Sequence, residues 1–229
     1  MKKISLNILF LLLISFLNAQ NFKDDMSKVK QKYNELKHYQ CHYQIEVSFD
    51  GKSHSKVDLD VKVSDSNYHY KIGNEIISVS NSEFMLTVDN DLKMIAIAKR
   101  NSMMANAVES IPDVNDSNYT VEYKKLTDGD IQYTIQYKQG ELSQSTLTID
   151  PNTWQIKSIA YNSALEEEYE WRKYGKRSTV ITFSNLKSID KLPESFFSLS
   201  KYIVKTKQGY ETTSTYKTYQ LLDTTIKPE

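Results

Sequence analysis

Apolar and polar residues alternate with a period of two through most of the chain after residue 40. Turn pairs rich in Asp, Asn and Gly, such as Asp50-Gly51 and Asp128-Gly129, separate the alternating stretches. This pattern is typical of half-buried β-strands joined by hairpins. The apolar members of the first two stretches are Tyr43, Ile45, Val47 and Phe49, then Val57, Leu59, Val61 and Val63. The whole pattern predicts about eleven or twelve strands.

One helix is expected before the strands, from Asp24 or Asp25 to about Tyr39. Its apolar stripe consists of Met26, Val29, Tyr33 and Leu36. An antiparallel sheet of this length has to curl to hide one of its faces. The sequence therefore predicts a mainly β fold with few helices, in which a curved antiparallel sheet forms a barrel or half-barrel around a helix.

Residues 1–19 have the layout of a secretory signal peptide. Two lysines precede an apolar run over residues 4–17, and Ala19 offers a small residue at the cleavage point. The run is short for a membrane span, and the alternative, an uncleaved N-terminal anchor, lacks a following stop-transfer pattern. No Cys stands near the cleavage point, which argues against lipid attachment. We expect residues 20–229 to form one soluble domain in the periplasm or outside the cell.

The balance of charges argues against nucleic acid as a partner. The chain has 29 Lys+Arg and 29 Asp+Glu, without a long block of one sign, so the basic surface that binds nucleic acid is not predicted. Cys41 is the single Cys, and no internal disulfide can form. We expect a monomer that is stabilised by an ordinary apolar core.

Four stretches carry a resemblance to a known family. They are the helix followed by a strand opening at Gln40, the short strands over residues 70–99, the non-alternating segment from Ser102 to Ile111, and the segments 146–162 and 181–199 with an Asp-Pro turn and a closing Phe196-Phe197. In this order they resemble the outer-membrane lipoprotein carrier and receptor superfamily (LolA/LolB-like).

The resemblance implies a half-barrel of about eleven strands around helices, with an apolar cavity for the acyl chains of a lipid or of a lipoprotein anchor. The segment 102–111 corresponds to the family's lid. The arginine with which the carrier holds its lid shut has no counterpart before Arg100. Lys56 or Lys62 could donate instead, but Lys lacks the fixed fork of Arg. The residues after Tyr210 extend beyond the pattern and could add a strand at the sheet edge.

Residues that could carry catalysis or bind a metal ion are few. His38 and His42 lie four apart, as zinc ligands on a helix do, but the change from helix to strand at residues 39–43 would separate them. Cys41 beside His42 could form a thiolate pair, whereas a lone Cys entering a strand is commonly a small buried residue. The sequence has no Gly-rich phosphate loop and no nucleophile elbow. We therefore expect no enzymatic activity, no cofactor and no metal ion.

Four tyrosines fall at even spacing on two neighbouring predicted strands: Tyr119, Tyr123, Tyr133 and Tyr137. They could form an aromatic platform for a glycan or a peptide. We favour the alternative, in which they pack across the strands with their hydroxyl groups reaching water.

We expect a non-enzymatic carrier or binding protein of the cell envelope that holds an acyl chain or a lipoprotein anchor. The predicted ligand-binding residues, on the concave face of the sheet and on the lid, are Ile45, Val47, Leu59, Val61, Leu86, Met103, Met104 and Val108. Its partners would be lipid or lipoprotein acyl chains, or an envelope protein. The alternative is a protein-interaction or structural module whose curved sheet is filled by its own side chains.

Overall fold

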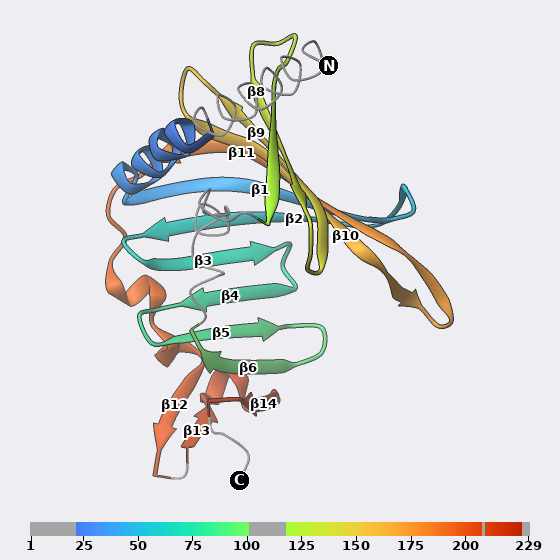
Figure 1. Ribbon diagram of the computed structural model, residues 1–229. Helices are drawn as coiled ribbons and strands as arrows, with labels where there is room; N and C mark the ends of the chain where they lie inside the picture. Colours follow the sequence, from blue (N-terminus) through green and yellow to red (C-terminus); the bar gives the residue numbers. More distant parts are fainter. Residues whose placement is uncertain (1–21, 101–117, 208, 226–229) are drawn as a thin grey trace, which may run out of the picture. The chain divides into compact units, whose positions relative to one another are not determined.

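The computed structural model describes residues 22–100, 118–207 and 209–225, and these are mainly β (Figure 1). The strands of the main sheet are β1 (His38–Phe49), β2 (Lys52–Ser64), β3 (Asn67–Ile72), β4 (Ile76–Ser80), β5 (Phe84–Asp89), β6 (Met94–Lys99), β7 (Tyr119–Lys125), β8 (Ile131–Tyr137), β9 (Leu142–Asp150), β10 (Gln155–Glu170), β11 (Lys173–Ser188) and β14 (Gln220–Asp223). A second, two-stranded sheet consists of β12 (Ile203–Thr206) and β13 (Gly209–Thr212). The described residues also form three short 3-10 helices, η2 (Glu194–Phe197), η3 (Leu199–Lys201) and η4 (Ser214–Tyr216).

The main sheet has the strand order β14-β6-β5-β4-β3-β2-β1-β11-β10-β9-β8-β7. Consecutive strands from β2 to β6 and from β7 to β11 pair antiparallel. In the described part of the chain, β7 and β14 each have one neighbour, so the sheet does not close into a barrel. The predicted fold class, a mainly β chain built on one large curved antiparallel sheet with few helices, is confirmed. The expected extra strand in the tail is β14, which pairs parallel with β6.

Contacts along the backbone group the chain into two compact units, which are described separately here. The first unit comprises the described residues of 1–35, 44–57 and 111–183, and the second those of 36–43, 58–110 and 184–229. The expectation of a single domain over residues 20–229 stays a prediction. Among the described residues, no helix is both long enough and apolar enough to span a bilayer. The predicted signal peptide lies outside the described residues.

In the first unit a helix through residues 22–35 packs against the sheet. Its predicted stripe is confirmed at Met26, Val29 and Tyr33, which are buried. The Tyr133 hydroxyl donates a hydrogen bond of 2.7 Å to Asp25 Oδ2, and the Phe22 ring meets the Tyr133 ring edge-on at 4.9 Å. These contacts hold the helix on the face of β8 that carries Tyr133.

The boundaries of this helix differ from the prediction at both ends. Asp24 and Asp25 lie inside the helix rather than capping it, and the helix ends at residue 35. The chain then enters β1 at His38, because its backbone finds sheet partners there: Ile189 N donates to His38 O at 3.1 Å. Pairing with distant residues therefore overrides the local helical period at residues 36–39.

The four tyrosines of β7 and β8 form two cross-strand pairs. Tyr119 lies opposite Tyr137, and Tyr123 lies opposite Tyr133, with ring centroids 6.4 and 5.6 Å apart. Tyr133 is fully buried beneath the helix. This arrangement favours the packing interpretation over an open aromatic platform.

Candidate functional site

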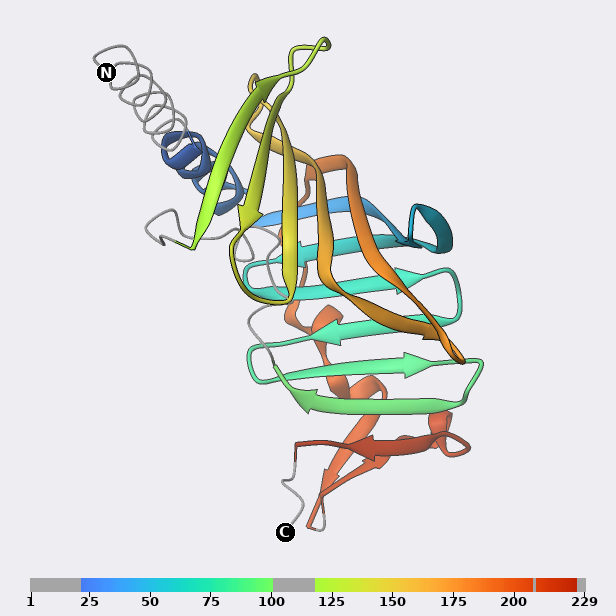
Figure 2. The ribbon, with the colours of Figure 1, turned by 45° about the vertical axis from the view of Figure 1, so that its right-hand side comes forward.

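The pairing register of β2–β6 in the second unit defines two faces (Figure 2). Residues directly opposite each other on neighbouring strands project from the same face. One line of partners consists of Lys62, His69, Val79, Leu86 and Ile97, and the line beside it consists of Val63, Tyr68, Ser80, Met85 and Ala98. Because the two lines are offset by one residue, they lie on opposite faces. We call these the Leu86 face and the Tyr68 face.

The Leu86 face is covered by residues from the C-terminal part of the chain (Figure 1). The members of this core are Val79, Leu86, Val88, Ile95 and Ile97 from the sheet, and Phe197, Leu199, Tyr202 and Ile203 from the covering segment. All five sheet residues are 0% exposed. The side chains of this face are therefore already in contact with the chain's own residues.

Leu86 was expected to lie with Leu59 and Val61, and the register corrects this grouping. Val61 pairs with Tyr70, which places Val61 on the Tyr68 face. Leu86 instead lies opposite Val79 on the Leu86 face. The physical reason is that β4, β5 and β6 carry apolar residues on both faces, so alternation alone does not tell which of them faces the covering segment.

Apolar side chains on the Tyr68 face are less buried than those on the Leu86 face. Leu59, Val61 and Val63 of β2 are 7–8% exposed. The members further along the sheet are half-buried: Ile72, Ile76, Met85, Met94, Ala96 and Ala98. The structure thus places two of the predicted residues, Leu59 and Val61, on a face whose further apolar side chains are partly exposed and share that face with Ser78, Ser80, Thr87 and Asp89.

The remaining predicted residues lie elsewhere or outside the described part of the chain. Ile45 and Val47 share one face of β1 by strand alternation, and both are half-buried. Met103, Met104 and Val108 lie outside the described residues, as does the whole segment 102–111, so the predicted lid stays a prediction.

Tyr68 gives its face a polar group that sequence analysis missed. Its side chain is 4% exposed, and its ring stacks on that of Tyr70 at 6.3 Å with an angle of 10° between the planes. Burial raises the pKa of the Tyr68 hydroxyl above its ordinary value, which favours the protonated form further. A tyrosine in an alternating strand looks like any other strand residue in the sequence, and only the geometry distinguishes it.

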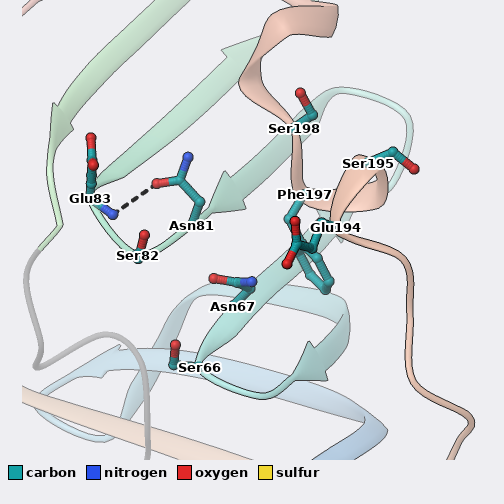
Figure 3. A pocket seen from close by; sticks show the side chains of 9 residues that line it. All are labelled: Ser66, Asn67, Asn81, Ser82, Glu83, Glu194, Ser195, Phe197 and Ser198. Atoms are coloured by element: carbon teal, nitrogen blue, oxygen red, sulfur yellow. Dashed lines mark hydrogen bonds between the residues drawn. The ribbon is translucent and has the colours of Figure 1, made fainter.

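A polar pocket of about 650 Å³ lies where the β2–β3 and β4–β5 turns meet η2 (Figure 3). Its lining residues are Ser66, Asn67, Asn81, Ser82, Glu83, Glu194, Ser195, Phe197 and Ser198. Arg100 links the two turns, because its Nη1 donates to Asn81 O at 3.1 Å and its Nη2 to Ser66 O at 2.6 Å. The first arginine of the chain therefore fixes turns of the sheet.

Lys56 and Lys62, the two possible substitutes for the carrier's arginine, both lie on β2. Lys62 lies on the Leu86 face with its ammonium group 5.7 Å from the centre of the Phe196 ring. Lys56 is exposed on β2.

A second pocket, of about 520 Å³, contains His42 and Asp60. His42 Nδ1 lies 3.0 Å from Asp60 Oδ1 and His42 Nε2 lies 3.2 Å from Asp58 Oδ1, which raises the pKa of His42. His38 bonds elsewhere, with its Nδ1 2.9 Å from Ser64 Oγ. In the part of the chain that the structure describes, no group of His, Cys, Asp and Glu is arranged to hold a metal ion.

Cys41 is buried, and burial raises the pKa of its thiol to about 11. The thiol is therefore protonated at neutral pH, and a protonated thiol is a poor nucleophile. This environment favours the packing interpretation of Cys41 over a thiolate pair with His42.

Comparisons with known proteins find similar folds. No protein-family model and no curated protein matches the chain. An uncharacterized conserved protein from Thermus thermophilus is similar with a TM-score of 0.50 and 9% identity, over 89% of this chain and 99% of that chain. A LolA superfamily protein from Nitrosomonas europaea has a TM-score of 0.37 and 10% identity, over 76% and 97%. A domain described as an outer membrane lipoprotein-sorting protein from Vibrio parahaemolyticus has a TM-score of 0.41 and 11% identity, over 80% and 98%. At these identities the similarity concerns the fold alone.

Proposed function

We propose that this protein is a non-enzymatic lipid-binding protein of the cell envelope that holds an acyl chain on the Tyr68 face. The observation that supports this proposal is the difference between the two faces of β4–β6. On the Leu86 face five apolar side chains are fully buried under the chain's own C-terminal residues, with Ile77 and Phe84 half-buried at the margin, whereas the apolar side chains of β4–β6 on the Tyr68 face are all half-buried. Burying an acyl chain contributes about 0.8 kcal/mol per CH₂, so binding on such a face needs no catalyst.

The proposed site combines predicted residues with residues that the register adds. Leu59 and Val61 are retained, and the half-buried Ile72, Ile76 and Met85 extend the same face. Leu86 is left out because it lies on the other face. The sequence motifs support the ligand class, since lipoprotein carriers with these motifs bind acyl chains, and the signal-peptide layout of residues 1–19 supports export to the periplasm.

The proposal is tested by adding a charge to the site. Met85→Asp places a carboxylate among apolar neighbours, so we expect it to weaken binding of a fluorescent fatty-acid probe at least tenfold, about 1.4 kcal/mol or more. Lys71→Asp is the matched control, because it adds a negative charge to an exposed position on the opposite face of the same sheet. Probe fluorescence gives the affinity, and urea unfolding checks that both variants remain folded.

Two results would contradict the proposal. If Met85→Asp binds the probe as tightly as wild type, the acyl chain does not lie on the Tyr68 face. If wild type binds no probe and releases no lipid in native mass spectrometry, the interaction-module alternative gains support. In that alternative, the chain's own side chains would cover the whole sheet in the way that they cover the Leu86 face.

A further inference from the structure

The Tyr68 hydroxyl stands out among the buried polar groups of the described residues. It is the one buried side-chain nitrogen or oxygen there that has no hydrogen-bond partner. Buried polar groups are nearly always hydrogen-bonded, because leaving one unpaired costs about 1–3 kcal/mol. A buried hydroxyl without a partner is therefore a position at which a ligand atom is expected to bind.

The neighbouring serine hydroxyl groups donate their protons to other atoms. Ser80, directly opposite Tyr68 on β4, lies close enough to offset part of the upward pKa shift, but its Oγ donates to Asn81 O at 3.2 Å. Ser78 Oγ donates to Leu86 O at 3.2 Å. The Tyr68 Oη has no hydrogen-bond partner among the described residues, and Tyr68 lies between Val63 of β2 and Ser80 of β4.

Arg100 fixes the surroundings of this donor. Tyr68 follows the β2–β3 turn, and Ser80 precedes the β4–β5 turn; the Arg100 guanidinium group bonds to a carbonyl oxygen in each turn. This clamp connects the two strands that flank the Tyr68 hydroxyl. The donor is therefore held in place before a ligand arrives, which lowers the entropic cost of binding.

We propose that Tyr68 is the polar anchor of the lipid site and donates a hydrogen bond to the carbonyl oxygen at the head of an ester-linked acyl chain. This inference rests on the proposed function. The hydrocarbon tail would lie over the half-buried apolar side chains of the same face, which include Ile72, Ile76 and Met85. The anchor gives the face a preference for esters of fatty acids over plain hydrocarbons, which burial alone does not provide.

An ester fits this position better than a free carboxylate. A buried carboxylate is costly unless a cation pairs with it. Arg100, whose charge acts on the Tyr68 hydroxyl, already directs two of its nitrogens to backbone carbonyl oxygens. An uncharged carbonyl oxygen accepts the Tyr68 hydrogen bond without bringing a charge into the apolar face.

The test compares two tyrosines that differ in burial. Tyr68→Phe removes the unpartnered hydroxyl, and Tyr70→Phe removes a hydroxyl from the adjacent half-buried ring on the same face. Affinities for methyl palmitate, palmitate and hexadecane are measured by displacement of a fluorescent acyl probe. We expect Tyr68→Phe to weaken methyl palmitate binding about three- to tenfold and to leave hexadecane binding unchanged, while Tyr70→Phe changes neither.

Unfolding of the ligand-free protein provides a second readout. Because the Tyr68 hydroxyl has no partner, Tyr68→Phe should be at least as resistant to urea as wild type. A merely structural hydroxyl would instead lower the urea midpoint when removed.

The outcomes separate this inference from the proposed function. Equal binding of methyl palmitate by wild type and Tyr68→Phe overturns the anchor but leaves acyl binding intact. A loss for palmitate alone overturns the choice of an ester. If wild type binds none of the three compounds, the proposed function fails and the anchor fails with it.

Discussion

Two histidines of the second unit show how position on the sheet sets the chemistry of a residue. His42 lies between the carboxylates of Asp60 and Asp58, and their hydrogen bonds raise its pKa. His69 lies against the Phe196 ring at 5.0 Å, and burial lowers its pKa to about 4. The charges that face His69 are those of Lys71, Lys62 and Lys201, and they lower the pKa further. The two residues therefore respond to acid in opposite directions.

We predict that His69 makes the fold less stable as the pH falls. Its pKa is about 4 in the folded protein and 6.5 in the unfolded chain, so between these values the unfolded chain binds more protons and stability falls with decreasing pH. From pH 7 to pH 5 the loss should be about 1–2 kcal/mol after allowance for partial exposure. Urea unfolding of wild type and His69→Gln at both pH values measures it.

The control for this prediction is His42→Gln. The raised pKa of His42 stabilises the fold below the unfolded value of 6.5 and stops doing so as the pH rises through the folded value. Removing His42 should therefore steepen the loss of stability on acidification, whereas removing His69 should reduce it. Parallel curves for wild type and His69→Gln would show that His69 is solvated in the folded protein.

Alternation along one strand was enough to group residues within that strand, but not between strands. It placed Ile45 and Val47 together on β1, and Leu59 and Val61 together on β2. It could not assign Leu86 to a face, because β4, β5 and β6 each carry apolar residues on both of their faces. The register depends on contacts between distant residues, and the C-terminal segment that buries Leu86 comes more than one hundred residues later in the chain.

Tyr68, at the centre of the proposed site, is a second residue that the sequence pattern could not single out. Nothing in the residues around Tyr68 distinguishes it from the other fifteen of the chain's 16 tyrosines. Its importance comes from a buried hydroxyl without a hydrogen-bond partner, which is a property of the packed structure.

At the scale of elements, the β10–β11 hairpin shows how a glycine allows two elements to approach. A Cβ atom on Gly175 would lie 2.8 Å from Asp50 Oδ2 and 3.3 Å from Phe49 Cβ. Asp50 has little freedom to move, since its Oδ1 accepts from Lys176 N at 3.0 Å and its N donates to Lys176 O at 3.1 Å. The hairpin thus packs against the β1–β2 turn at a point where only glycine fits.

Gly175→Ala should therefore destabilise the protein by about 1–3 kcal/mol, the usual cost of overpacking. Trp171→Ala is the matched control on the same hairpin, because Trp171 is 79% exposed at its tip and should change stability by less than about 1 kcal/mol. Urea midpoints of the two variants are compared with wild type. Equal midpoints for Gly175→Ala and wild type would mean that the hairpin can move away from Asp50.

Elements were predicted well where local signals and tertiary contacts agree. The Asp50-Gly51, Asn90-Asp91 and Asp128-Gly129 turns all connect neighbouring strands in the structure. The helix was predicted to run too far because residues 36–39 continue its apolar spacing, yet β1 begins at His38. Strand pairing contributes backbone hydrogen bonds that the local period does not reveal.

At the scale of the molecule, the fold class followed from the sequence because a long series of alternating strands has few ways to bury one face. The site followed only in part. Composition and motifs indicated an apolar ligand, while the choice of face required the register and the position of the covering segment. The central claim is therefore a claim about faces: C-terminal residues of the chain cover the Leu86 face, and we propose that an acyl chain binds on the Tyr68 face, whose apolar side chains in β4–β6 are half-buried among the described residues.

Photocrosslinking with a phospholipid that carries a diazirine in its acyl chain tests this claim most directly. Trypsin should release residues 72–93 as one peptide, since it cleaves after Lys71 and Lys93, and this peptide carries both faces of β4 and β5. We predict adducts on Ile72, Ile76 and Met85 of the Tyr68 face. Adducts confined to Ile77, Leu86 and Val88, or found only on the exposed hairpin around Trp171, would contradict the account.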